Sequence, residues 1–320
     1  MSKKTIIITG GTGFFGANLT RHLLATGHQI HLLVRPEYNA WRLKSIIKEL
    51  HLHVVSLADE ESLSRTIRRL KPDWIFHLAT YGDYSWQNNF QQMLTTNILG
   101  TSHLVWACLK TGFDTFVNTG SSSEYGFKDH PTTEDELPQP NSHYAITKTG
   151  ATLFCQYAAR KFRVRIPTLR LYSVYGPYEE PRRLLPTLIV KGFKNQLPAL
   201  VAPKTARDFV YVDDVVQAYL KVAANQLKDP GTIFNIGSGQ QTTIEELLTL
   251  IRKILKIKTA PVWGTMKKRN WDTETWVANI EKAKRLLKWQ PEVTFKKGVL
   301  QMASWFRQQP EILSFYEKNI

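Results

Sequence analysis

The sequence predicts an α/β protein built around a doubly wound parallel sheet. Apolar runs alternate with segments of helical spacing along most of the chain, which is the pattern of a parallel sheet covered by helices. The first run, residues 6–8, is Ile-Ile-Ile, as expected of a strand buried on both faces. A turn with glycines at positions 10, 13 and 16 joins it directly to a helical segment with leucines on one side.

The other elements follow in order. We expect strands at residues 6–8, 29–34, 53–57, 74–78, 115–118, 165–172 and 233–236. Helices are expected at residues 17–24, 60–70, 90–109, 144–160, 184–194 and 242–254, with another after residues 207–216 and short helical pieces in the basic tail. Pro72 follows the end of the second helix. Thr242 or Thr243 is the expected cap of the helix at 242–254, with two glutamates in its first turn.

The glycine turn has the spacing of a dinucleotide-binding site. Gly10 permits a tight turn, Gly13 lets a pyrophosphate approach the backbone, and Gly16 lets the helix pack close to the strand. The helix that follows presents free N–H groups and a positive dipole to phosphates. Because the turn lies between a strand and a helix, a dinucleotide site is favoured over a turn without a ligand. The cofactor-binding residues predicted in this turn are Gly10, Thr12, Gly13, Phe14, Phe15 and Gly16.

The end of the second strand bears on the choice of cofactor. Folds that bind NAD place an acidic residue near this point to hold the adenosine ribose. Here Arg35 follows the strand and Arg42 lies close behind. Arginine suits a 2′-phosphate, so the sequence favours NADP, with NAD as the alternative and a surface role for Arg35 as the simpler reading.

Composition and charge narrow the protein class. The net charge of +15 comes from scattered basic residues without a nucleic-acid-binding motif, so we expect a few of them to bind phosphates and no nucleic-acid partner. No apolar run approaches the length of a membrane helix, and the first strand begins at once, which predicts a cytoplasmic protein without a membrane partner. Cys108 and Cys155 are expected to be core thiols, and no metal site is predicted.

A tyrosine and a lysine mark the predicted catalytic helix. Tyr144 and Lys148 lie one helical turn apart on one face. A nearby ammonium lowers the pKa of a phenol, which would make Tyr144 a proton donor or acceptor near neutral pH. A hydroxyl from Ser121, Ser122 or Ser123 could bind the same substrate oxygen, and Asn97 could hold the lysine through a water. Alone, this spacing is weak evidence for a catalytic pair, because any helix can carry it. After a glycine-rich turn and a serine loop, it becomes strong evidence.

With these motifs the sequence resembles the extended short-chain dehydrogenases/reductases, also called the NAD-dependent epimerase/dehydratase family of nucleotide sugars. The matching stretches are GGTGFFG at residue 10, HLAT at 77, TNILGT at 96, SSSEYG at 121, YAITK at 144, RLYSVYGP at 170, RDFVYVDDV at 207 and FNIGSG at 234. The resemblance implies a Rossmann fold and hydride transfer between a nicotinamide and a sugar carbon. It makes Tyr144 the acid/base, Lys148 its partner and ribose ligand, and Ser121 the substrate hydroxyl ligand.

The resemblance also implies the remaining parts. A dinucleotide-binding domain is expected at residues 1–174 plus 208–237, and a nucleotide-sugar-binding domain at 175–207 plus 238–320. Further cofactor contacts are expected at Leu57, Leu78, Ala79, Thr80, Asn97, Tyr172 and Val174. Substrate contacts are expected at Ser85, Arg182, Arg207 and Arg269, although a surface salt bridge is the simpler reading for the last two. A homodimer through the helices at 90–109 and 144–160 is expected.

Two departures from the family pattern matter. Sugar 4,6-dehydratases of the family place carboxylates directly after the serine or threonine, because elimination of water needs an acid/base pair. Here Glu124 comes one position late, so a dehydratase is disfavoured unless the loop is shifted. The aspartate that often contacts adenine is replaced by Ser56-Leu57, so that contact is uncertain.

The reaction is then predicted from the cofactor. A reductase must exchange its cofactor, and Arg35 favours NADPH. We therefore expect reduction of a nucleotide-linked 4-keto-6-deoxy sugar, with hydride to C4 and a proton from Tyr144. The stretch SSSEYGFKDHP resembles CDP-sugar 4-reductases of the abequose or paratose type, which favours a CDP-linked substrate. The alternatives are an epimerase with tightly bound NAD, a 4,6-dehydratase, and an inactive scaffold that senses NADP.

Overall fold

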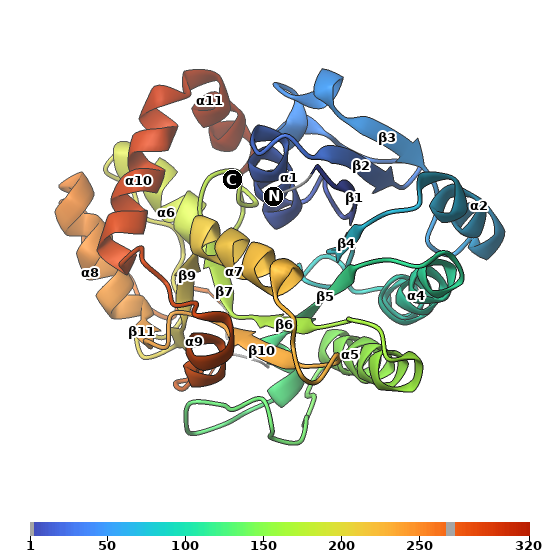
Figure 1. The fold of residues 1–320 in the computed structure, drawn as a ribbon. Helices are drawn as coiled ribbons and strands as arrows, with labels where there is room; N and C mark the ends of the chain where they lie inside the picture. Colours follow the sequence, from blue (N-terminus) through green and yellow to red (C-terminus); the bar gives the residue numbers. More distant parts are fainter. Residues whose placement is uncertain (1–2, 267–272) are drawn as a thin grey trace.

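The computed structural model describes residues 3–266 and 273–320. Its centre is a sheet of seven parallel strands in the order β10-β6-β5-β4-β1-β2-β3 (Figure 1). The strands are β1 (Thr5–Thr9), β2 (Gln29–Val34), β3 (His51–Val54), β4 (Trp74–His77), β5 (Thr115–Ser121), β6 (Thr168–Leu171) and β10 (Ile233–Ile236). The predicted doubly wound sheet is confirmed, and residues 233–236 return to it beside β6.

Helices cover both faces of this sheet. On one face lie α1 (Phe14–Ala25) and α7 (Val212–Ala224), and on the other lie α2 (Glu60–Leu70), α4 (Gly100–Thr111) and α5 (His143–Phe162). The all-isoleucine run of β1 explains the arrangement. Ile6 and Ile8 pack toward α1 and α7, while Ile7 packs toward α2, α4 and α5, and all three are fully buried. A strand without polar residues is stable only between two such layers.

A second hydrophobic core lies beside the sheet. It is formed largely by α6 (Leu184–Phe193), α8 (Ile244–Leu255), α10 (Phe295–Gln308) and α11 (Pro310–Asn319), which gather at the left of Figure 1. The part of the chain around this second core is called the second lobe. β7 (Ser173–Tyr175) pairs with β9 (Phe209–Tyr211), and these two strands contribute side chains to both cores. A further small sheet pairs β8 (Ala206–Arg207) with β11 (Thr242–Thr243). The short helix α9 (Glu281–Leu287) packs beside β10. The domain boundaries given above stay a prediction.

Three elements differ clearly from the sequence prediction. The strand expected at 53–57 lies at His51–Val54 as β3. The continuous helix expected at 90–109 begins as α3 (Phe90–Met93) and widens into a π-helical segment, Leu94–Leu99, before α4 starts. Such segments have one more residue per hydrogen-bonded turn and occur often at functional sites. The strand expected at 115–118 continues to Ser121 and is followed by a short 3₁₀ helix, Ser122–Tyr125. Of the two threonines predicted to cap the helix at 242–254, Thr243 is the cap. Its side chain accepts a hydrogen bond from the Glu246 N–H group in α8.

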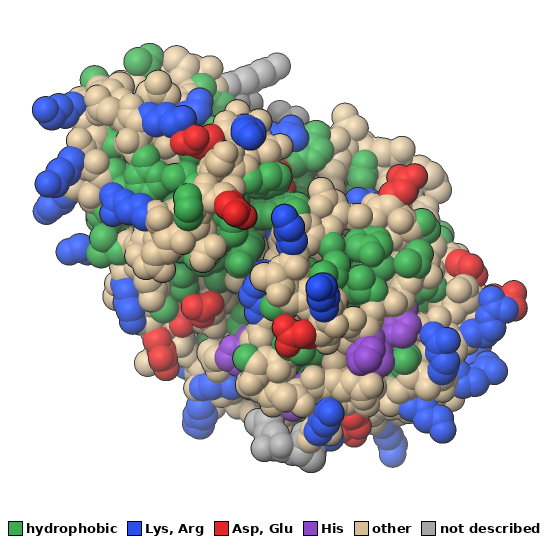
Figure 2. Space-filling view, turned by 90° about the horizontal axis from the view of Figure 1, so that it is seen from above, with side chains coloured by type: hydrophobic (Ala, Val, Ile, Leu, Met, Phe, Trp, Pro, Cys, Tyr) green, Lys and Arg blue, Asp and Glu red, His purple; other side chains and the backbone are tan. Residues whose placement is uncertain are grey.

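The basic side chains in Figure 2 and the two cysteines lie where the sequence predicts, at the surface and in the core respectively. Figure 2 shows Lys and Arg side chains dispersed toward the rim of one face, with hydrophobic side chains nearer its middle. Cys108 and Cys155 are buried free thiols, as predicted. Within residues 3–266 and 273–320, none of the helices combines the length and the apolar character that crossing a bilayer requires.

Candidate active site

A large cleft opens at the carboxyl ends of the parallel strands. It has a volume of about 1310 Å³ and is lined by the turns after β1, β4 and β5 and by loops of the second lobe. The strand order reverses between β1 and β4, which is where doubly wound sheets bind their ligands. The volume exceeds the roughly 300–1000 Å³ of a pocket for one small molecule. The cleft therefore has room for two ligands side by side.

The glycine turn closes tightly at one end of this cleft. Gly13 N–H donates to the Gly10 carbonyl at 3.0 Å, and Gly10 has a φ of +69°. A Cβ on Gly16 would lie 2.2 Å from the Gly10 carbonyl oxygen, and one on Gly10 would lie 2.7 Å from the Ala79 nitrogen. A side chain is thus excluded at Gly10 and Gly16 by backbone atoms. The predicted roles of these two glycines in packing agree with this geometry.

The beginning of α1 faces the cleft. Its cap residue, Gly13, has no side chain to accept the first N–H groups, and the described first turn holds no acidic residue. Thr12, Phe14 and Phe15 line the cleft with the glycines. Phe15 also packs on the Tyr219 ring, with centroids 4.7 Å apart. A phosphate would be held here by backbone N–H groups and the helix dipole, so these residues fit a dinucleotide.

A buried histidine, which sequence reasoning did not single out, holds the strand ends beside this turn. His77 Nδ1 lies 2.7 Å from the Thr9 hydroxyl and its Nε2 lies 2.8 Å from the Thr101 hydroxyl. Thr9 in turn accepts hydrogen bonds from the backbone N–H groups of Leu78 and Ala79. Burial, and then the Lys148 charge, lower the pKa of His77 to about 3, so the imidazole is neutral. It fixes the predicted cofactor contacts at Leu78 and Ala79, both in the cleft wall.

The two arginines after β2 have different positions. Arg35 is exposed and lines the cleft. Arg42 is buried and is not part of the cleft lining in the described chain, contrary to the prediction. Its Nε donates to the Tyr178 carbonyl at 2.7 Å and its Nη2 pairs with Glu180 at 3.0 Å. Arg42 is turned away from the cleft because distant residues of the second lobe supply a carbonyl and a carboxylate for it. No local sequence pattern reveals these partners.

The predicted catalytic pair lies where α5 passes β5. Tyr144 lines the cleft beside Thr80 and Ser121, whose side-chain hydrogen bonds lower the phenol pKa. Burial and the Asp83 charge outweigh them and raise the pKa of Tyr144 above its usual value. Lys148 is buried and donates to the Thr119 carbonyl. The expectation that the lysine would lower the phenol pKa is therefore not met by the protein alone, and the phenol is protonated at neutral pH.

The serine turn is built rigidly. Ser121 caps the 3₁₀ helix, accepting from the Ser123 N–H at 3.2 Å, and the two hydroxyl oxygens lie 2.8 Å apart. All three serines line the cleft, but Ser122 is 7% exposed. Of the three serines, Ser121 is the one whose hydroxyl is close enough to lower the pKa of Tyr144. The choice of Ser121 as the substrate hydroxyl ligand stays a prediction.

Asn97 makes direct hydrogen bonds to Tyr81 and Thr147, and its predicted contact with Lys148 through a water stays a prediction. Its amide donates to the Tyr81 carbonyl and the Thr147 hydroxyl, at 2.8 and 2.9 Å, and accepts from the Tyr81 N–H at 2.9 Å. The π-helical segment turns this side chain inward, where it joins the loop after β4 to α5. Asn97 is 1% exposed and lies outside the described cleft lining, so a direct cofactor contact is not supported.

Arginines and aromatic rings gather in another part of the cleft wall. Ser85 and Arg182, for which substrate contacts are predicted, line the cleft, and the Arg182 guanidinium lies 4.4 Å from the Trp86 ring centroid. The rings of Trp86 and Tyr84 are stacked, with centroids 4.8 Å apart. Arg183 pairs with Asp83. Asp83, Tyr84 and Arg183 were not among the predicted site residues. The first two lie in the polar, aromatic loop at residues 81–87, where the sequence predicts ligand binding, and Arg183 lies in the Pro- and Arg-rich loop at 176–183.

All but one of the remaining predicted cofactor and substrate contacts lie in the cleft wall. Leu57, Thr80, Tyr172, Val174 and Arg207 line the cleft. Tyr172 also hydrogen-bonds Thr132, and the Arg207 guanidinium lies 5.7 Å from the Trp276 ring centroid. Arg269 lies outside the described residues.

Fold and site together define a class of enzyme. Residues 6–237 match the model of the family described as "NAD dependent epimerase/dehydratase family". The chain belongs to this family, and it is an enzyme of that class.

Three relatives show the likeness in detail. The chain is 30% identical over 304 residues to the "Uncharacterized UDP-glucose epimerase YtcB" of Bacillus subtilis, covering 92% of this chain and 95% of that protein. Its fold matches the UDP-glucose 4-epimerase of Thermotoga maritima solved with UDP-glucose, at a TM-score of 0.86 and 26% identity over 95% of this chain and 99% of that one. It also matches the UDP-glucuronic acid 4-epimerase of Bacillus cereus solved with UDP-glucuronic acid and NAD, at a TM-score of 0.84 and 26% identity, with the same coverage.

Proposed function

We propose that this enzyme reduces a nucleotide-linked 4-keto-6-deoxy sugar with NADPH. The observation that carries the proposal is that the Tyr144 phenol and Ser121 line the same cleft as the exposed Arg35 side chain. A reductase needs a proton donor at this point, whereas an oxidation needs a base. Because Tyr144 is protonated at neutral pH, it holds the proton that the first task requires, and a positive charge nearby would ease its release. Arg35 at the cleft wall supports NADPH as the reductant.

The residues would divide the reaction between them. The bound cofactor supplies the hydride that is delivered to C4. Tyr144 donates its proton to the C4 oxygen, and the Ser121 hydroxyl hydrogen-bonds the same oxygen and fixes its position. Lys148, held by the Thr119 carbonyl, keeps its positive charge close to the phenol as a phenolate forms. Arg182 and Arg207 line the region where a diphosphate would lie.

Dehydration is disfavoured by the position of Glu124. Its carboxylate is fully buried and pairs with Arg170 at 2.9 Å, and it forms no part of the described cleft wall. The serine loop is therefore not shifted in the way that would bring this carboxylate to a substrate. Asp83 does line the cleft, but it is paired with Arg183.

Epimerisation with bound NAD is the second candidate. It is favoured by the names of the relatives, several of which are epimerases of UDP-sugars. A positively charged nicotinamide ring beside Tyr144 would lower the phenol pKa and allow it to act as a base. The nucleotide is CDP in our proposal, from the resemblance of residues 121–131, and UDP in this alternative.

One assay separates the candidates. Purified enzyme is incubated with NADPH and separately with CDP-, UDP- and dTDP-linked 4-keto-6-deoxy sugars, and loss of the reduced cofactor's absorbance is followed. Stoichiometric oxidation, abolished by Tyr144→Phe with unchanged NADPH affinity, supports the reductase. Isomerised UDP-sugar without net oxidation establishes the epimerase instead. Binding without turnover of any sugar points to the inactive scaffold.

Arg35 gives an independent test of the cofactor. Arg35→Gln should weaken NADPH binding by about 10-fold, the loss of one charge-assisted contact, and leave NADH binding unchanged. Equal losses for both cofactors would show that Arg35 does not contact a 2′-phosphate.

A homodimer through α4 and α5 completes the proposal. Leu153 and Tyr157 on α5 are 52% and 57% exposed, and Trp106 on α4 is 37% exposed. Trp106 packs edge-on against Phe162, with ring centroids 5.4 Å apart. Apolar side chains exposed in this number on two adjacent helices support burial against a second copy.

A further inference from the structure

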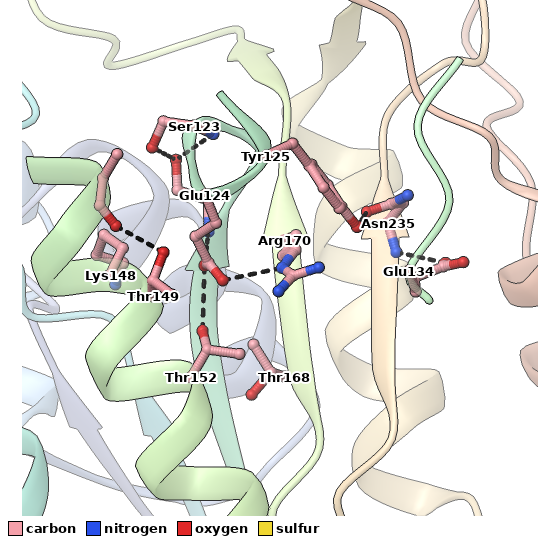
Figure 3. A network of polar contacts seen from close by, with 12 residues as sticks. Ser123, Glu124, Tyr125, Glu134, Lys148, Thr149, Thr152, Thr168, Arg170 and Asn235 are labelled. Carbon is pink, nitrogen blue, oxygen red and sulfur yellow. Dashed lines mark hydrogen bonds and ion pairs between the residues drawn. The ribbon is translucent and has the colours of Figure 1, made fainter. Parts of the chain in front are cut away.

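The Glu124 carboxylate connects three elements beneath the reaction centre. One oxygen, Oε1, accepts from the Ser121 N–H at 2.8 Å and from the Thr152 hydroxyl at 3.1 Å. The other, Oε2, accepts from Arg170 Nε at 2.9 Å. Figure 3 shows the side chain between the end of β5, helix α5 and strand β6. Thr152 lies one helical turn beyond Lys148, so the carboxylate joins the serine turn to the catalytic helix.

The site is built around this carboxylate. Glu124 is fully buried and Arg170 is 1% exposed. A Cβ on Gly120 would lie 2.8 Å from the Glu124 Oε1 and 3.0 Å from Cγ of Arg170, so the strand has a glycine where the pair needs room. The guanidinium carbon of Arg170 lies 4.5 Å from the Tyr125 ring centroid, and the Tyr125 hydroxyl donates to Asn235 at 2.7 Å. These contacts hold the pair from the side opposite the catalytic helix.

Burying two charges costs free energy, and an apolar pair of similar volume is often as stable or more stable. The Nη1 of Arg170 even lacks a hydrogen-bond partner within the described chain. A contribution to folding stability therefore does not account for the pair. Its contacts with Ser121 and α5 point to a different use.

We propose that Glu124, held by Arg170, is a positioning residue that sets the Ser121 hydroxyl against Tyr144 for reaction. The proposal rests on the proposed function of these two residues. Glu124 and Ser121 form a reciprocal capping pair, in which each side chain accepts from backbone of the same short turn. These contacts fix the backbone of the turn from the core side, so the Ser121 hydroxyl faces the cleft in one orientation.

The charge of Glu124 also acts on the lysine. Burial lowers the pKa of Lys148, and the Glu124 carboxylate is the first of the charges that oppose this. Neutralising Glu124 while Arg170 stays charged would lower the lysine pKa further. The alkaline limb of the pH–rate profile should then move to lower pH, which a purely structural role does not predict.

Three variants test positioning against stability. Glu124→Gln keeps an oxygen for Ser121 and Thr152 but removes the charge. Glu124→Met removes all three contacts, and the double variant Glu124→Met/Arg170→Met also removes the unpaired cation. Asp214→Asn is the matched control, because Asp214 is a buried carboxylate bonded to the Glu292 and Val293 N–H groups, away from the cleft lining in the described residues.

We expect kcat to fall by about 100-fold in Glu124→Met, as a misplacement of about 1 Å would cause, with little change in substrate KM. The double variant should regain thermal stability without regaining kcat. Glu124→Gln should keep more activity than Glu124→Met and show the shifted alkaline limb. Asp214→Asn should lose stability and keep kcat. If kcat of the Glu124 variants follows their stability, or the double variant regains full activity, the positioning role is refuted.

Crystal structures of the wild type and Glu124→Met give a readout that does not depend on turnover. The positioning role requires the Ser121 hydroxyl to leave its place beside Tyr144 in the variant, and an unmoved turn refutes it. If the wild type turns over no nucleotide sugar, the proposed function has failed, and the position of this turn still decides whether Glu124 sets it.

Discussion

The tightest contact in the glycine turn makes Gly16 its most informative position. A Cβ at Gly16 would lie 2.2 Å from the Gly10 carbonyl oxygen and 2.8 Å from the Gly11 Cα. The closest ordinary carbon–oxygen contacts are about 3.3 Å, so Gly16→Ala must separate turn and helix by about 1 Å. Both contacts are with backbone, which has no rotamer to relieve them.

The consequence falls on cofactor binding. A displacement of this size removes at least one charge-assisted hydrogen bond between a backbone N–H and a phosphate, worth about 1.5–3 kcal/mol. Affinity for the dinucleotide cofactor should therefore fall by about 10- to 100-fold. The measurement is a titration of the cofactor by fluorescence or calorimetry, with circular dichroism as a check on the fold.

Gly150→Ala is the matched control. Gly150 lies inside helix α5, and a Cβ there would meet only the end of the flexible Ile98 side chain, at 3.1 Å. This variant should bind the dinucleotide cofactor as the wild type does. A Gly16→Ala protein that folds and binds the cofactor within twofold of the wild type would show that the close approach of helix and turn is not needed for cofactor binding.

Three further predictions test the molecule elsewhere. Burial and the neighbouring His53, His51 and Arg69 hold the pKa of His31 at about 4 in the folded protein. The unfolded side chain binds a proton near pH 6.5. The contribution of His31 to the free energy of unfolding should therefore be fully present above about pH 6.5 and fall by about 3 kcal/mol as pH decreases toward 4. Urea unfolding at several pH values should show this loss, and a His31→Gln protein with the same acid dependence would contradict the assignment. Arg42→Met should cost on the order of 3 kcal/mol, because it leaves Glu180 without its partner, yet NADPH titration should show no change; weakened NADPH binding would return Arg42 to the cofactor site. The proposed homodimer should become a monomer in Leu153→Glu, as measured by light scattering, and should persist in Phe127→Glu, at another exposed apolar residue. A dimer that survives the first change lies on another surface.

Much of the fold was readable from local patterns. The all-isoleucine strand, the glycine spacing and the alternation of elements depend on short-range rules of burial and backbone conformation. They determine that residues 6–8 lie between two helical layers and that the next helix begins at the glycine turn. Tyr144 and Lys148 were identifiable for the same reason, since their separation is a property of one helix.

The direction and partners of the polar side chains were decided by tertiary structure alone. Arg35 and Arg42 look equivalent in the sequence, but the second lobe places a carboxylate and a carbonyl beside Arg42 and leaves Arg35 in the cleft. Glu124 looked like a displaced catalytic acid, but it pairs with Arg170, 46 residues further along the chain. Such contacts satisfy buried charges across distant segments, and no periodicity or spacing within one segment encodes them.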